Sequence, residues 1–201
     1  MRREFHVRFC EGPGVQSPRA TRLVIGFERK EDAERVMVVL GKRMERYGLT
    51  LHPDKTRLVD FRRPPSGQMS GKGPSTLDFL GFTLYWRRTL KGRWEMWCRT
   101  RSASLRRAVQ AVDDFCRRHR HDSVRAQHAA LVRRVNGHMN YLGVNGNGRS
   151  LAKFIRQVER AWFKWLRRRS QKTRLTWERF SSIADVFRLP PPLVRVQIWG
   201  R

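Results

Sequence analysis

Residues 150–169 read SLAKFIRQVERAWFKWLRRR and carry the clearest structural pattern in the chain. Apolar side chains recur at steps of three and four, which predicts one buried face of a helix about 30 Å long. Ser150 is the expected N-cap. The side chains expected to face inward are Leu151, Phe154, Ile155, Val158, Trp162 and Trp165. The opposite face carries Lys153, Arg156, Arg160, Lys164 and Arg167.

The same periodicity covers the whole second half of the chain. It predicts a helix from Ser102 or Ser104 to about residue 119, a second over about 124–142 and a short third over 176–187. The sequence NGNG at 145–148 predicts a tight break before the long helix. Past three prolines at 190–192, LVRVQIW is strand-like. The expected buried positions are Leu105, Ala108, Val109, Val112, Cys116, Val124, His128, Leu131, Val135, Met139 and Leu142.

The first half has a different pattern. Strands are predicted over 23–27, 56–61, 77–86 and 94–100, the last two joined as a hairpin through Lys91 and Gly92. A helix is expected over 31–47, with Tyr47 on its apolar face and Gly48 ending it. Residues 1–21 are expected to be irregular, and 62–76 to form a loop. The fold class is therefore α+β, with a boundary near residue 100.

The net charge of the chain indicates what kind of molecule it binds. The chain has 201 residues and a formal net charge of +27, and its basic side chains are 36 Arg and 8 Lys. A guanidinium binds phosphate bidentately and stacks on bases, so nucleic acid is the expected partner. A GC-rich genome explains the excess of Arg over Lys but not the shortage of acids. No apolar run has the ~20 residues of a membrane span, and no export signal or CxxC pair occurs, so a cytoplasmic location is expected.

Residues suited to catalysis are scarce. Asp54, Asp60 and Asp78 flank predicted strands without forming a pair, and the adjacent Asp113 and Asp114 point about 100° apart on a helix. Arg117 and Arg118 are available to pair with these two acids. Cys116, His119 and His121 lack the second pair of ligands that a zinc site needs. No phosphate-binding glycine loop is present, and no small-molecule substrate is evident.

Several segments, taken in order, resemble one family. They are LVIGF at 23–27, GLTLHPDKT at 48–56, DFLGF at 78–82, RRVNGHMNYLG at 133–143 and RAWFKWLRRR at 160–169. This series resembles the reverse transcriptase/maturases that bacterial group II introns encode. The resemblance runs from residue 23 to residue 201. It implies an irregular segment unrelated to the family over 1–22, the end of a reverse transcriptase palm over 23–100 and a helical thumb, or X, domain over 101–201.

The resemblance also implies that polymerase activity is absent. In that family a YADD box stands just before the LVIGF-type strand, and its aspartates hold the catalytic Mg²⁺ ions. Thr21 and Arg22 occupy those positions here, and the fingers and first part of the palm, with the third catalytic Asp, are missing. No catalytic residue, metal ligand or cofactor is therefore expected, although the intact family uses Mg²⁺ as an RNA-directed DNA polymerase.

The expected nucleic-acid-binding residues come from two sources. The resemblance places Lys55 near the active-site end of the palm and Leu80, Gly81 and Phe82 in its primer-grip turn. Basic positions on the three long helices are expected to contact phosphates. They are Arg106, Arg107, Arg133, Arg134, Lys153, Arg156, Arg160, Lys164, Arg167, Arg168 and Arg169.

The expected function is that of a truncated group II intron-encoded protein, which binds structured intron RNA and assists its splicing. An RNA/DNA duplex is a second possible ligand. Three alternatives stay open: one half of a split reverse transcriptase, the product of a non-functional gene, and a generic basic RNA-binding protein.

Overall fold

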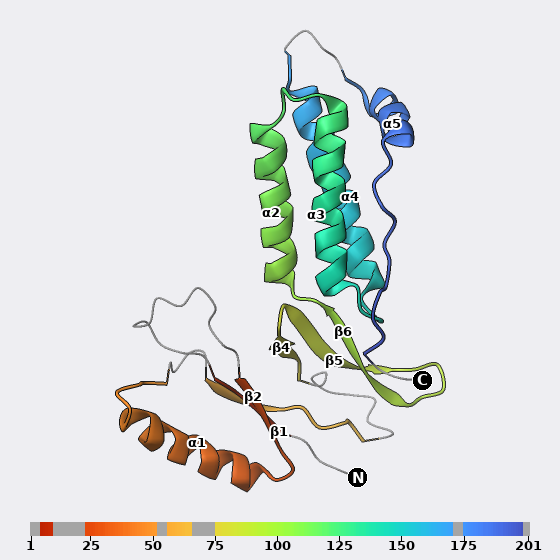
Figure 1. Ribbon diagram of the computed structural model, residues 1–201. Coiled ribbons are helices and arrows are strands. Elements are labelled where there is room, and N and C mark those ends of the chain that lie inside the picture. The colour runs from red at the N-terminus through yellow and green to blue at the C-terminus, as the bar shows by residue number, and fades with distance from the viewer. Residues whose placement is uncertain (1–4, 10–22, 52–55, 66–74, 171–174, 199–201) are drawn as a thin grey trace. The chain divides into compact units, whose positions relative to one another are not determined.

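The computed structural model describes residues 5–9, 23–51, 56–65, 75–170 and 175–198 (Figure 1). The chain divides into two compact units, Met1–Trp97 and Cys98–Arg201. The described residues form five helices and two three-stranded sheets, which confirms the mixed α and β class.

The first sheet contains a strand that the sequence analysis does not predict. β1 (Phe5–Phe9) lies between β2 (Leu23–Phe27) and β3 (Arg57–Asp60) and pairs antiparallel with both. The prediction of irregular chain is therefore wrong at 5–9, and residues 1–4 and 10–22 lie outside the described part of the chain. Apolar and polar residues alternate in FHVRF, which is the period-two pattern of a strand.

α1 (Lys30–Glu45) packs against this sheet. Ala33 is its fully buried residue, and Glu31 and Asp32 lie in the first turn, where the helix dipole favours negative charge. The helix ends earlier than predicted, so Tyr47 lies in the turn beyond it and is 73% exposed. The half-buried side chains packed around Ala33 are Ile25, Phe27, Leu40, Leu51 and Leu58.

The second sheet has the order β4 (Leu77–Phe79), β5 (Phe82–Arg88), β6 (Trp94–Thr100). The single strand predicted over 77–86 is interrupted, because Leu80 and Gly81 turn the chain back on itself. Both have positive φ, 45° and 81°, as a two-residue hairpin turn requires. β4 and β5 therefore pair antiparallel across this turn.

The helical unit places α2 (Ser102–Arg118), α3 (Val124–Leu142) and α4 (Gly148–Arg167) side by side, with α5 (Trp177–Val186) beside them (Figure 1). Burial follows the predicted stripes on α2 and α3 only in part: Leu105, Ala108, Val109, Val124 and His128 are half-buried rather than buried, and Phe115, Gln127 and Ala130 are buried in addition. The core comprises Val112, Phe115, Cys116, Ala130, Leu131, Val135, Met139, Leu142, Leu151, Phe154, Ile155, Val158, Ala161, Trp162, Leu166 and Phe180.

Two predictions about α4 need correction. The helix begins at Gly148 with Asn147 as its N-cap residue, so Ser150 lies within the first turn and caps nothing. Trp165 is half-buried rather than a core residue, because its indole reaches a carboxylate on α2. The Asn147 side chain is instead fully buried and bonds to Thr100 and Leu142, which joins the turn before α4 to the end of β6.

The C-terminal segment lies against the same turn. Arg195 donates its backbone N–H to Gly143 O at 2.6 Å, and Val196 O accepts from Asn145 N at 3.0 Å. A Cβ on Gly143 would lie 2.2 Å from the Met139 carbonyl oxygen and 2.9 Å from that of Leu193, so no side chain fits between the end of α3 and this segment. The strand-like pattern predicted at 193–199 appears, within the described residues, as a single parallel bridge between Val144 and Val196.

Among the described residues, none of the helices combines the length and the apolar character needed to cross a bilayer.

Candidate nucleic-acid interface

One face of α4 carries a line of cations. Six basic residues recur there at steps of three and four, and each is exposed. At 100° per residue they fall within an arc of about 80°, and they extend over about 27 Å of helix. We call this line the α4 ladder; it consists of Arg149, Lys153, Arg156, Arg160, Lys164 and Arg167.

The buried face of α4 fixes where the ladder points. Seven core residues occupy the opposite side of the helix, among them Leu151, Val158 and Trp162 at 0 to 1% exposure. Rotating the helix would expose these side chains and bury cations, which is strongly unfavourable. The ladder is therefore held toward solvent before any ligand arrives.

Most of the ladder forms no ion pair with the acidic residues that the structure describes. Within the described part of the chain, Lys164 is the one member with an ion pair, formed by its Nζ 2.8 Å from Asp113 Oδ1. Arg149 belongs to the ladder but is absent from the sequence prediction, because the helix was expected to begin after it. A helix start placed at the NGNG turn would have included it.

The C-terminal end of the ladder is partly engaged by its neighbours. Trp165 Nε1 donates to Asp113 Oδ1 at 3.0 Å, and Lys164 Nζ lies 4.9 Å from the centre of the Trp165 ring. Arg168 also lies over that ring, with its Cζ at 5.2 Å. Both cations keep exposed surface, so this end presents charge that is already positioned by an aromatic side chain.

Two of the predicted binding residues have internal roles. The Arg169 guanidinium donates to the backbone carbonyls of Arg120 and Asp122, which ties the end of α4 to the turn between α2 and α3. Arg134 lies 3.7 Å over the Phe115 ring and donates to Ala130 O at 3.2 Å. Their hydrogen bonds therefore stabilise the helical unit itself.

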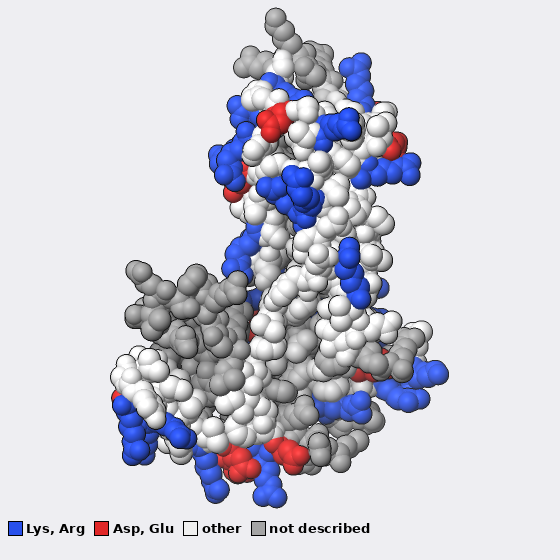
Figure 2. Space-filling model, in the orientation of Figure 1, with Lys and Arg blue, Asp and Glu red and all other residues white. Residues whose placement is uncertain are grey.

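The other predicted residues lie elsewhere. Arg106 and Arg107 are exposed on α2, and Arg133 is exposed on α3. Lys55 lies outside the described residues. Figure 2 shows Lys and Arg side chains over the visible face of the helical unit, with few Asp or Glu between them.

The turn from Leu80 to Phe82 belongs to the first unit. Leu80 is 50% exposed and Phe82 is half-buried. Thr83 Oγ1 donates to Asp78 Oδ1 at 2.5 Å, which braces the turn from both strands. The backbone of this turn is therefore held in one conformation. A backbone that contacts a ligand closely needs such a fixed conformation.

The candidate carboxylates that the structure describes do not converge on one site. Asp114 lies 3.6 Å from Arg117, whereas Asp113 pairs with Lys164. Asp60 binds Arg62, and this hydrogen bond lowers the pKa of its carboxyl. Asp54 is outside the described residues. Among those that are described, no three His, Cys, Asp or Glu side chains gather closely enough to hold a metal ion.

Cys116 and His119, which the sequence analysis considered as zinc ligands, each have surroundings in the helical unit that account for them. Burial raises the pKa of the Cys116 thiol to about 12. His119 Nδ1 lies 2.8 Å from Asp122 Oδ2 on the surface of the following turn.

No protein-family model matches this chain, and no curated protein has a matching sequence.

Proposed function

We propose that this chain is the RNA-binding portion of a group II intron-encoded reverse transcriptase/maturase. In this proposal, residues 23–100 correspond to the end of a reverse transcriptase palm and residues 101–201 to the thumb, or X, domain. The ordered series of family-like segments from LVIGF to RAWFKWLRRR supports the assignment. Its function is to bind folded intron RNA and stabilise the structure in which the RNA splices itself.

The α4 ladder is the observation that carries the RNA-binding proposal. Its cations lie on one exposed face of a single 20-residue helix whose opposite face is buried, so their arrangement needs little rearrangement on binding. Arginine, the most frequent member, grips phosphate oxygens in bidentate fashion. A line of about 27 Å is long enough to follow several successive phosphates of one strand.

The geometry favours folded RNA over a flexible strand. A-form helices are recognised mainly through phosphates, 2′-hydroxyls and overall shape. A rigid line of charge matches phosphates that are already held at fixed positions, whereas a flexible strand loses conformational freedom when it is straightened against the same line.

Polymerase activity is not part of the proposal. By the resemblance, Thr21 and Arg22 stand where two metal-binding carboxylates belong. A guanidinium at such a position repels Mg²⁺, and neither side chain supplies the carboxylate that this ion prefers.

The proposal is tested by comparing RNAs of equal length. Fluorescence anisotropy measures the affinity of the full chain for a folded group II intron RNA and for a sequence-scrambled RNA. We expect clearly tighter binding to the folded RNA. Equal affinity would indicate a generic basic RNA-binding protein instead. Primer extension with Mg²⁺ on an RNA template is expected to yield no cDNA, and cDNA would contradict the inactive assignment.

A further inference from the structure

A hollow of about 300 Å³ lies between α4, α5 and the segment that follows α5. Local sequence patterns do not predict this hollow, because its walls come from two helices and depend on how those helices pack. Its lining residues are Glu159, Trp162, Trp177, Phe180, Ser181, Ala184, Asp185, Phe187, Arg188 and Leu189.

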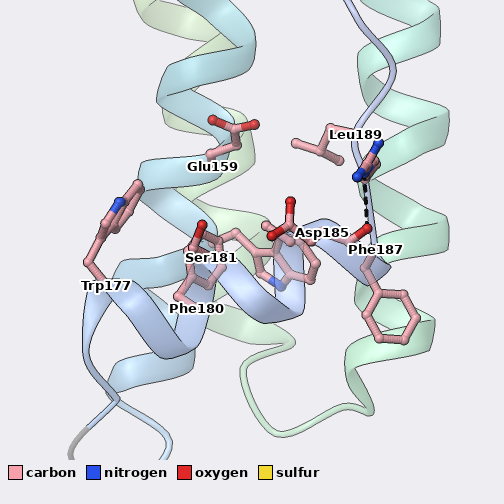
Figure 3. Close-up of a pocket in the computed structure, with 10 residues that line it drawn as sticks. Glu159, Trp177, Phe180, Ser181, Asp185, Phe187 and Leu189 are labelled. Carbon is pink, nitrogen blue, oxygen red and sulfur yellow. Dashed lines mark hydrogen bonds between the residues drawn. The ribbon is translucent and has the colours of Figure 1, made fainter.

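Acceptor groups surround the opening of this hollow. Figure 3 shows the Glu159 and Asp185 carboxylates and the Ser181 hydroxyl around the same opening. Among the described residues, no hydrogen bond or ion pair engages either carboxylate. Burial raises the pKa of Glu159, opposed by the nearby charge of Arg156. Glu159 is half-buried and Asp185 is exposed, so both carboxylates are accessible to a ligand that brings hydrogen-bond donors.

The floor is aromatic and well packed. Trp162 and Phe180 are 1% exposed and meet edge to face at 5.6 Å, while Trp177 is 49% exposed at one side. Arg188 is held at the rim, since its Nε donates to Asp185 O at 3.0 Å and its carbonyl accepts from His128 Nε2 at 2.9 Å. A flat, apolar ligand edged with hydrogen-bond donors fits such a lining.

The net positive charge of the chain determines which kinds of hydrogen-bond-donating ligand can approach the hollow. The chain carries a net charge of +27, which repels free organic cations from its surface. Glu159 lies on α4 one turn from Arg156 of the α4 ladder, within reach of a strand bound to the ladder. A ligand that brings neutral donors on a polyanionic backbone satisfies both conditions, and a nucleobase is such a ligand.

We infer that the hollow between α4 and α5 receives an unpaired guanine of the RNA bound along the α4 ladder. The inference rests on the proposed RNA binding. Guanine presents N1–H and N2–H side by side, and one carboxylate accepts both. In adenine and cytosine an acceptor nitrogen adjoins the exocyclic amine, and in uracil two carbonyls flank N3–H, so each places an acceptor against a carboxylate.

The test uses an RNA hairpin with one bulged nucleotide, prepared with G, A, C or U at that position. Anisotropy gives the affinity of the full chain for each RNA. We expect the G bulge to bind about 5- to 100-fold more tightly than the U bulge. Glu159→Gln and Asp185→Asn are each expected to reduce this ratio toward one. Glu45→Gln on α1 removes the same charge from the other compact unit and is expected to leave the ratio unchanged.

The outcomes separate this inference from the proposed function. Salt-dependent binding of all four RNAs with equal affinity would overturn the guanine site and leave RNA binding intact. A G preference that persists in both hollow variants would also overturn it. Failure to bind any RNA would contradict the proposed function itself. Spermidine that binds in a Glu159-dependent manner, without a G preference, would make the hollow an organic-cation site.

Discussion

The side chains of Asn147 and Thr100 bond to each other in both directions. Thr100 Oγ1 donates to Asn147 Oδ1 at 3.1 Å, and Asn147 Nδ2 donates to Thr100 Oγ1 at 2.8 Å. Oδ1 also accepts the Thr100 backbone N–H at 2.7 Å, and Nδ2 donates to Leu142 O at 2.8 Å. This buried network fixes the start of α4, and with it the start of the α4 ladder.

Asn147→Ala is expected to lower the free energy of unfolding by about 2–4 kcal/mol, because it leaves buried groups of Thr100 and Leu142 unpaired. Urea denaturation followed by circular dichroism measures the change. Asn140→Ala, at an exposed position of α3, is the matched control and is expected to change stability little. Equal effects of the two substitutions would contradict the role assigned to Asn147.

Arg169 is expected to contribute to the stability of the helical unit, whereas Arg156 is not. Arg169→Gln removes charge-assisted hydrogen bonds to two backbone carbonyls and is expected to destabilise the helical unit by about 1–3 kcal/mol. Arg156→Gln, on the exposed ladder, is expected to leave thermal stability nearly unchanged. Differential scanning fluorimetry distinguishes them, and a larger loss in Arg156→Gln would reverse the assignment.

His138 makes stability sensitive to acid. Burial lowers its pKa to about 4, its ring stacks on Phe154 at 3.7 Å, and its Nε2 has no hydrogen-bond partner among the described residues. In the unfolded chain the imidazole of His138 has a pKa of about 6.5. As pH falls, the unfolded chain therefore takes up this proton before the folded chain does. The contribution of neutral His138 is complete above that value and declines as pH falls toward about 4.

Because His138 keeps some solvent contact, this loss amounts to about 1–3 kcal/mol. His138→Leu is expected to flatten the fall in stability between pH 6.5 and 4, values set by the unfolded and folded imidazole. Urea titrations at a series of pH values measure it. An identical pH profile in wild type and variant would contradict the assignment.

Cys98 and Cys116 are both buried, at 1% and 2% exposure, and burial raises the pKa of each thiol. Neither is expected to react with iodoacetamide in the native state, since the thiolate is the reactive form. Mass spectrometry of alkylated peptides is expected to show labelling of both only after denaturation. Rapid labelling of Cys116 without denaturant would show that the helical core opens readily.

β1 is the central strand of the first sheet, with Val7 opposite both Ile25 and Leu58. Val7→Pro removes a ladder N–H and is expected to abolish protection of β2 and β3 amides in hydrogen exchange. Val7→Thr retains strand propensity and is expected to preserve that protection. Unchanged exchange in Val7→Pro would show that the sheet does not depend on this strand.

Sequence patterns predicted local structure well and long-range contacts poorly. The α4 stripe was predictable because every buried residue follows one helical period and because cations fill the opposite face. The internal role of Arg169 was not, since its partners lie 47 and 49 residues away in sequence. β1 was missed because its alternation spans only FHVRF and its partners are distant in sequence.

The candidate site divides in the same way. Most of the α4 ladder follows from periodicity alone, whereas the hollow that contains Glu159 and Asp185 depends on how α5 packs against α4. Nothing local to either acid distinguishes it from an ordinary surface carboxylate.

The central claim is that the α4 ladder binds structured RNA through phosphates. The most direct measurement compares Arg156→Gln/Arg160→Gln with Arg35→Gln/Arg43→Gln, which removes equal charge from exposed positions of α1. Affinity for folded intron RNA is measured over a series of salt concentrations. The ladder variant is expected to bind more weakly, with the slope of log K against log salt smaller by about 1.4–1.8, while the α1 variant keeps the wild-type slope. Equal slopes in the two variants would show that α4 does not contact the RNA.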